Sequence, residues 1–168
     1  MTTHYRVDRH VDAKVPMRDG VRLSADLFLP RGAGPAPTVL MRTPYSNNTE
    51  ANIEKGQRLA NAGYNCVIAD VRGRWDSEGD YTPFYDEALD GYDTQQWIGQ
   101  QPWSDGKIGT AGASYLGTTQ WRPAPLASEY LTCMVPRVIC TDYHGGLIYP
   151  GGALQLNVAM TWGMRTHG

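Results

Sequence analysis

One serine in the chain stands where serine chemistry would be expected. In the segment GASYLG, Ser114 lies between small residues, at the point where a short predicted strand must turn sharply into a helix. Such a turn, a nucleophile elbow, lifts the hydroxyl above the carboxyl edge of a parallel sheet, where it can attack an acyl carbon. Gly112 would let the backbone reverse, and Gly117 would let the new helix pack closely. The backbone N–H of Tyr115 would then point toward a developing oxyanion.

The short motif leaves other interpretations open. The pattern G-x-S-x-G is not met strictly, because Leu116 holds the fifth place and the second glycine comes one residue later. Ser114 could simply cap a helix that follows a tight strand turn. The turn from Gly109 to Gly117 could instead bind a nucleotide, although it matches neither G-x-G-x-x-G nor G-x-x-x-x-G-K-[ST]. The motif therefore needs support from the rest of the chain.

The elements that must position this serine follow a repeating order. A hairpin is predicted over residues 11–30, with its turn at Asp19 and Gly20. Apolar runs after it alternate with helical segments, which is the βαβ pattern of a mainly parallel sheet with helices on both faces. The sequence thus predicts an α/β fold with an antiparallel leading hairpin. The later strands are expected over residues 37–42, 64–70, 107–114 and 131–140, and helices over residues 49–62 and 86–100, directly after Ser114 and from near Ala153.

Two of these helices carry further signals. In the helix over residues 86–100, Leu89, Tyr92 and Gln96 fall on one side, as in an amphipathic helix. After the serine, the two prolines of QWRPAP each remove an amide and clash with the preceding turn. We therefore expect the helix that supports the serine to be short or kinked.

Composition bounds the class of protein. The chain has 168 residues, enough for one domain or slightly more, and 41% of them are hydrophobic while 19% are charged, as in a packed globular protein. A formal net charge of −2 gives no basic field for nucleic acid or for an anionic membrane. The first ten residues hold no apolar run, so neither a secretory signal nor a membrane anchor is expected there. Three cysteines without a C-x-x-C pair fit a reducing compartment, and a cytoplasmic location is expected.

Several longer segments carry a resemblance to a known family. They are MRDGVRLSADLFLP, MRTPY, GYNCVIADVRGRWDSEGDY, WI followed by QPWSDGKIG, GASYLGTTQW and YPGGAL, which together cover about residues 15–160. In this order and with these separations, the chain resembles the cocaine-esterase-like and X-Pro dipeptidyl-peptidase group of serine hydrolases within the α/β-hydrolases. The resemblance implies an α/β-hydrolase fold and hydrolysis of a small-molecule ester or amide. We expect no cofactor and no metal.

Carried over position by position, the resemblance implies roles for four residues. Ser114 would be the nucleophile of an acyl-enzyme mechanism, and the hydroxyl of Tyr45 and the backbone N–H of Tyr115 would form the oxyanion hole. Tyr45 also follows Pro44 at the end of a neighbouring strand, where a rigid phenol can aim a donor at the same point. A core tyrosine with a wet tip is the plainer interpretation of that residue. Trp162 takes the place of an aromatic that lines the acyl pocket, although a lone tryptophan on a helix usually packs.

The proton-handling groups of a serine hydrolase are not evident in this sequence. A serine needs a base that a third group orients. In the family the acid and the histidine come after a helical cap, on segments expected to lie beyond Gly168. We therefore expect the amino-terminal part of such an enzyme, with a partial catalytic domain over residues 1–145 and the start of a helical cap over residues 146–168. None of the histidines matches the family's base; they are His4, His10, His144 and His167.

An internal triad and a metal site are the two weaker alternatives. Asp142 and His144 preserve the order serine, acid, histidine, but residues two apart on a strand point the same way, whereas a triad needs the imidazole between acid and serine. Together with Cys140 they could form a metal cluster, which would lack a fourth ligand. Asp70, at a strand end before a polar loop, is expected to fix that loop's path and to take no part in catalysis.

The second function hypothesis is non-catalytic. The chain would then be a truncated product or a split-enzyme subunit that works with a partner. An unfinished parallel sheet leaves an open edge, which favours a homo-oligomer or a complementing chain.

Overall fold

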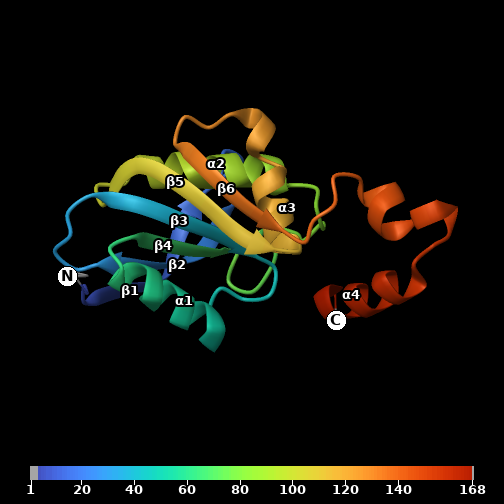
Figure 1. The fold of residues 1–168 in the computed structure, drawn as a ribbon, viewed down its shortest axis with the longest axis horizontal. Coiled ribbons are helices and arrows are strands. Elements are labelled where there is room, and N and C mark those ends of the chain that lie inside the picture. The colour runs from blue at the N-terminus through green and yellow to red at the C-terminus, as the bar shows by residue number, and fades with distance from the viewer. Residues whose placement is uncertain (1–3, 168) are drawn as a thin grey trace. The chain divides into compact units, whose positions relative to one another are not determined.

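The computed structural model describes residues 4–167, which divide into two compact units, with the boundary between Arg137 and Val138 (Figure 1). The first unit holds a six-stranded sheet in the order β1-β2-β4-β3-β5-β6. Its two leading pairs are antiparallel and its other three are parallel, so the predicted mainly parallel α/β fold with an antiparallel hairpin is confirmed. The strands are β1 (Val7–Pro16), β2 (Arg22–Pro30), β3 (Ala36–Thr43), β4 (Asn65–Asp70), β5 (Ser104–Ala113) and β6 (Leu131–Arg137).

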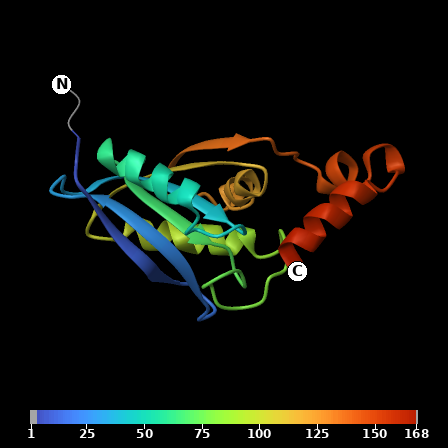
Figure 2. The same cartoon turned by 90° about the horizontal axis from the view of Figure 1, so that it is seen from below.

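Helices α1 (Glu50–Asn61) and α2 (Glu87–Gly99) pack on opposite faces of the sheet (Figure 2). Successive side chains of a strand point to opposite faces. Accordingly, Cys66 and Ile68 of β4 join the core under α1, whereas Val67 packs with Ile98 of α2. The central strand is therefore apolar on both faces, which is why its sequence reads as one continuous buried run.

The ends of α1 agree with the sequence. The side chain of Thr49 accepts a hydrogen bond from the backbone N–H of Asn52, which caps the first turn. Gly63, two residues past the helix, has a φ of 93°, in the left-handed region that favours glycine.

The buried face of α2 differs from the predicted one. Leu89 is 46% exposed, although it was expected on the amphipathic side. Arginines from other elements, Arg42 and Arg72, pair with carboxylates of α2, and these pairs allow acidic side chains to face the interior. The buried residues of α2 are Glu87, Asp90, Gly91, Thr94, Gln95 and Ile98.

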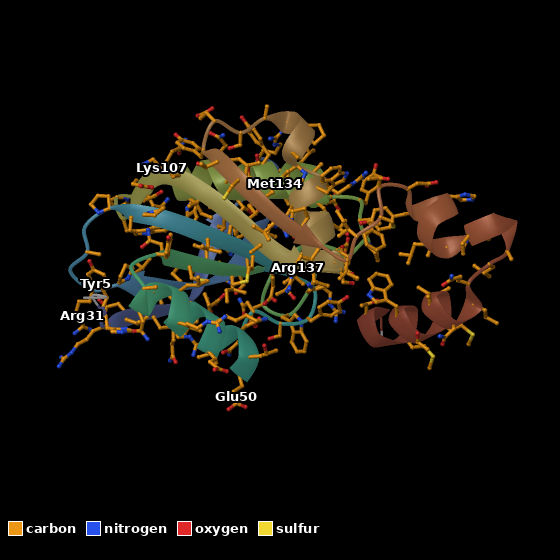
Figure 3. All side chains as sticks on the ribbon, viewed as in Figure 1. Tyr5, Arg31, Glu50, Lys107, Met134 and Arg137 are labelled. Atoms are coloured by element: carbon orange, nitrogen blue, oxygen red, sulfur yellow. The ribbon has the colours of Figure 1, made fainter. Side chains whose placement is uncertain are left out.

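The helix after Ser114 is short, as its prolines predict. Helix α3 (Tyr115–Trp121) has seven residues, and a 3₁₀ turn over Ala124–Leu126 follows it. Strand β6 follows the 3₁₀ turn in the chain and forms one edge of the sheet. It ends at Arg137, three residues before the predicted end. Figure 3 labels Met134 and Arg137 on this edge strand.

The second unit is helical within its described residues. It contains the π-helical turn η2 (His144–Ile148), the 3₁₀ turn η3 (Pro150–Gly152) and the helix α4 (Leu156–His167). Helix α4 begins three residues after the predicted start at Ala153. Within residues 4–167, no helix has both the length and the hydropathy that a membrane crossing requires.

Candidate active site

Ser114 occupies the turn between β5 and α3, and its side chain is exposed. Its φ of 59° and ψ of −124° form a combination that residues with a side chain rarely adopt. The backbone N–H donates to the carbonyl of Arg137 at 2.9 Å, and the carbonyl accepts from the N–H of Gly117 at 2.8 Å. The side chain makes no capping bond to α3, so the interpretation of Ser114 as a side-chain helix cap is wrong.

Gly112 explains how the chain can make this turn. Its φ is 150°, and a Cβ built on it would lie 2.3 Å from the Cβ of Leu116. No real side chain tolerates that separation, so the turn requires glycine here. The first turn of α3 thereby passes close to the end of β5.

Tyr45 lies beside Tyr115 at the carboxyl edge of the sheet. Strands β3 and β5 are neighbours in the sheet, and the two tyrosines follow their ends. Their rings meet edge to face, with centroids 6.5 Å apart and an angle of 75° between the ring planes. Tyr45 is 37% exposed, so it is more open to solvent than a core tyrosine. The structure therefore brings Tyr45 close to the residue that follows Ser114.

Loop residues after β4 hold the segment that carries Tyr45. The carbonyl of Pro44 accepts hydrogen bonds from the indole N–H of Trp75 at 3.0 Å and from Nε of Arg74 at 3.2 Å. The backbone N–H of Tyr45 donates to the hydroxyl of Thr43 at 3.0 Å. These contacts fix the peptide group that precedes the Tyr45 Cα.

The side chain of Tyr115 is buried and anchored by polar groups that sequence reasoning missed. Its hydroxyl donates to Oε1 of Glu87 at 2.7 Å and accepts from the backbone N–H of Phe84 at 3.0 Å. Its ring stacks on that of Phe84 with centroids 4.9 Å apart. Burial and the neighbouring Glu87 carboxylate raise the pKa of Tyr115, so the phenol stays protonated and remains a donor.

Glu87 is itself buried, and it pairs with a buried arginine. The distance from its Oε2 to a terminal guanidinium nitrogen of Arg42 is 2.9 Å, and both side chains are almost completely buried. Burial raises the pKa of Glu87, whereas the Arg42 charge and the Tyr115 hydroxyl oppose that rise. In the sequence Glu87 reads only as an acid at a helix start, so no local signal identifies this contact.

Asp70 plays the structural part expected of it. The side chain is fully buried, and one of its oxygens accepts the backbone N–H of Asn47 at 2.7 Å. Its backbone carbonyl accepts the hydroxyl of Ser77 at 2.8 Å. Burial raises the pKa of Asp70 to about 7. The residue therefore joins the loop after β3 to the loop after β4.

Asp142 and His144 do not lie on a strand, contrary to the geometry assumed for them. Asp142 accepts the backbone N–H groups of His144 at 3.0 Å and Gly145 at 3.1 Å, so it caps the turn of η2. The His144 ring stacks on Tyr149 with centroids 4.8 Å apart. Among the described residues, no cluster of three or more histidine, cysteine or acidic side chains could hold a metal.

The remaining predicted residues are placed as follows. Trp162 lies on α4 in the second unit and is partly buried, and its role stays a prediction. His4 and His10 are exposed in the first unit. The side chain of His167 lies outside the described residues.

Comparison with known proteins identifies relatives over most of the chain. Residues 19–167 match the X-Pro dipeptidyl-peptidase (S15) family. Cocaine esterase of Rhodococcus sp. (strain MB1 Bresler) is 39% identical over 155 residues, which are 88% of this chain and 27% of the esterase. The chain thus spans about a quarter of the length of that relative.

Solved structures agree with the sequence match. An α-amino acid ester hydrolase superposes with a TM-score of 0.74 and 31% identity, covering 89% of this chain and 28% of that one. A CocE/NonD family hydrolase from Staphylococcus aureus superposes with a TM-score of 0.70 and 28% identity, covering 76% of this chain and 27% of that one. By sequence and by fold, this chain belongs to the X-Pro dipeptidyl-peptidase (S15) family and corresponds to the amino-terminal part of its members.

Proposed function

We propose that this chain supplies the nucleophile and the oxyanion donors of a serine hydrolase that cleaves an ester or amide through an acyl-enzyme. The observation that carries the proposal is the exposed Ser114, held at positive φ between β5 and α3. Such a strained, exposed serine at the carboxyl edge of a parallel sheet is the geometry of a nucleophile elbow. Family membership supports the same reading.

In the proposed reaction, Oγ of Ser114 attacks the acyl carbon while a histidine base takes its proton. The carbonyl oxygen becomes negative in the tetrahedral intermediate, and the Tyr45 hydroxyl and the Tyr115 backbone N–H donate hydrogen bonds to it. The base returns the proton to the leaving alcohol or amine as the ester or amide bond breaks. Water then attacks the acyl-enzyme and frees the acid. Tyr45 and Tyr115 follow the carboxyl ends of the neighbouring strands β3 and β5, which supports a shared target for both donors.

The substrate class follows from the relatives. Cocaine esterase and an α-amino acid ester hydrolase are named for ester cleavage, so a small-molecule ester is the first substrate to assay. We further propose that residues 1–145 form the partial catalytic domain and residues 146–168 the start of a helical cap. In this scheme Trp162 lines the acyl pocket.

In a second candidate function, the chain is inactive alone, as a truncated product or a split-enzyme subunit, and works only when a partner supplies further strands. Strand β6 is one of the two edge strands of the sheet, and it exposes Cys133 and Val135, the latter at 54%. An exposed parallel edge strand with apolar side chains favours pairing with another strand. The quarter-length match to cocaine esterase supports this candidate, with either a complementing chain or a second copy at that edge.

One experiment tests both candidates. Ester hydrolysis is measured for the 168-residue chain and for a chimera that joins it to the remaining sequence of the Rhodococcus cocaine esterase. We expect turnover by the chimera, and we expect Ser114→Ala to reduce it by about a thousandfold or more. Ser104→Ala, at the other end of β5, serves as the matched control and should retain activity.

The two candidates differ in what the chain does alone. Weak or absent turnover by the 168-residue chain, together with strong turnover by the chimera, supports the second candidate, in which the chain needs further strands. Strong serine-dependent turnover by the chain alone would show a complete site within it. A Ser114→Ala chimera that keeps full activity would overturn the proposed nucleophile.

A further inference from the structure

A single buried carboxylate contacts one residue of the proposed oxyanion hole, Tyr115, and the end of the strand that leads to the other, Tyr45. Oε1 of Glu87 accepts the hydroxyl of Tyr115 at 2.7 Å, and Tyr115 supplies the backbone donor. Oε2 of Glu87 lies 2.9 Å from Arg42, which stands three residues before Tyr45 at the end of β3. Arg42 also donates to the backbone carbonyl of Glu87 at 3.1 Å.

These contacts join three separate elements. Glu87 begins α2, Tyr115 begins α3, and Arg42 belongs to β3. A hydroxyl of α3, from Thr119, donates to the backbone carbonyl of Arg42 at 3.3 Å and closes the same group of contacts. Glu87 thus contacts Tyr115 directly and, through Arg42, the end of the strand that precedes Tyr45.

We propose that Glu87 is a positioning residue that fixes the Tyr115 amide and the Tyr45 phenol relative to each other. It does not touch substrate; it acts through Tyr115 and through the Arg42 end of β3. This inference rests on the proposed function, because it assigns Glu87 to the oxyanion donors of that site. It goes beyond the family match, which names no role for this carboxylate.

The identity of the third partner carries this role. A buried ion pair needs further hydrogen bonds for its remaining lone pairs, and here that bond comes from the residue that follows Ser114. Here the carboxylate places one oxygen on Arg42 and the other on the phenol beside Ser114. The Phe84 backbone N–H donates to the same phenol at 3.0 Å, so the Tyr115 ring is held at its tip from two directions.

The test is amide hydrogen exchange on the folded 168-residue chain, which needs no turnover. Two amides report on the two arms: the N–H of Gly117, which donates to the Ser114 carbonyl, and the N–H of Tyr45, which donates to Thr43. In Glu87→Gln we expect both to exchange about tenfold faster relative to Val67 in the core of β4. The matched control is Asp93→Asn, which removes a carboxylate from α2 that pairs with the exposed Arg18. It should change both ratios by less than about twofold.

Two narrower variants keep the inference testable if Glu87→Gln does not fold. Tyr115→Phe removes one oxygen and should accelerate exchange at Gly117 while leaving Tyr45 unchanged. Arg42→Lys keeps the charge but loses the planar guanidinium, and it should accelerate exchange at Tyr45. Acceleration that is uniform across Gly117, Tyr45 and Val67 would overturn the proposal, because it would show a loss of global stability alone.

A kinetic arm separates this proposal from the proposed function. In the chimera, Glu87→Gln should lower kcat about tenfold and leave KM unchanged, since oxyanion contacts strengthen in the transition state. If Ser114→Ala leaves turnover intact, the proposed function fails. The exchange ratios of Gly117 and Tyr45 still test whether Glu87 fixes the two tyrosines relative to each other. A Glu87→Gln chimera that raises KM with kcat unchanged would contradict the positioning role.

Discussion

The carboxyl ends of β4 and β5 both place a polar residue at the same edge of the sheet, yet the two residues differ in almost every physical respect. Asp70 ends β4 and is fully buried, with a backbone amide on its carboxylate. Ser114 follows β5, is exposed, and takes a positive φ. Exposure and backbone strain, more than polarity or position on the sheet, therefore separate a residue available for chemistry from one that holds loops together.

Among the substitutions that test this comparison, we expect Tyr45→Phe to have the largest effect. It removes the proposed phenolic donor while keeping the ring that meets Tyr115. We expect kcat of the chimera to fall by about a hundredfold to a thousandfold, the loss typical of one oxyanion donor, with KM unchanged. The free energy of unfolding should change by less than about 0.5 kcal/mol, since the side chain is 37% exposed. Tyr85→Phe, on the nearby loop and 75% exposed, is the control and should keep activity.

The strained turn can be broken through its glycine. Gly112→Ala places a Cβ 2.3 Å from that of Leu116, and we expect a loss of about 2–3 kcal/mol in the free energy of unfolding, measured with urea. Gly106→Ala on the same strand is the control: its φ is 80°, but the nearest atom to a new Cβ is 3.7 Å away. That variant should lose only about 1 kcal/mol. Equal losses would show that crowding against α3 does not shape the turn.

The burial of Asp70 should make the free energy of unfolding depend on pH. Its folded pKa of about 7 lies above the ordinary value of 3.8, so the folded state binds more protons between those values. The free energy of unfolding should therefore fall as pH rises from about 4 to about 7. Asp70→Asn resembles the protonated form, so its free energy of unfolding, relative to that of the unsubstituted chain, should rise by about 2–3 kcal/mol between pH 5 and pH 8.

The control for this pH effect is Asp80→Asn, an exposed carboxyl on the same loop that is not among the charges raising the pKa of Asp70. Its pH profile of stability should match that of the unsubstituted chain to within about 0.5 kcal/mol. An Asp70→Asn profile parallel to that of the unsubstituted chain would contradict the raised pKa and the burial that causes it.

Much of the fold could be predicted because its signals are local. The Asp19-Gly20 turn, the buried runs and the glycine at the end of α1 each act over a few residues, and the structure confirms the strands and helices they predict. The two prolines after Ser114 correctly predict a short α3. The position of Gly112 before the serine likewise follows from a local steric requirement.

The buried network could not be predicted because its members are far apart in sequence. Tyr115 and Glu87 are 28 residues apart, and Arg42 comes from yet another element. A carboxylate such as Glu87 on a helix predicts a solvated face unless its partner is known. The same reason explains the misjudged face of α2, where Leu89 is exposed and acids are buried. Pairing across the fold overrides the local amphipathic pattern there.

The central claim is that Ser114 is the reacting nucleophile, and covalent trapping tests it most directly. A fluorophosphonate forms a bond from its phosphorus to the serine oxygen as fluoride leaves, and peptide mass spectrometry of the treated chimera locates that bond. We predict a single adduct on Ser114, absent from Ser114→Ala and retained in Ser104→Ala. Ester turnover that is blocked by the reagent while the adduct lies on another residue would contradict the account.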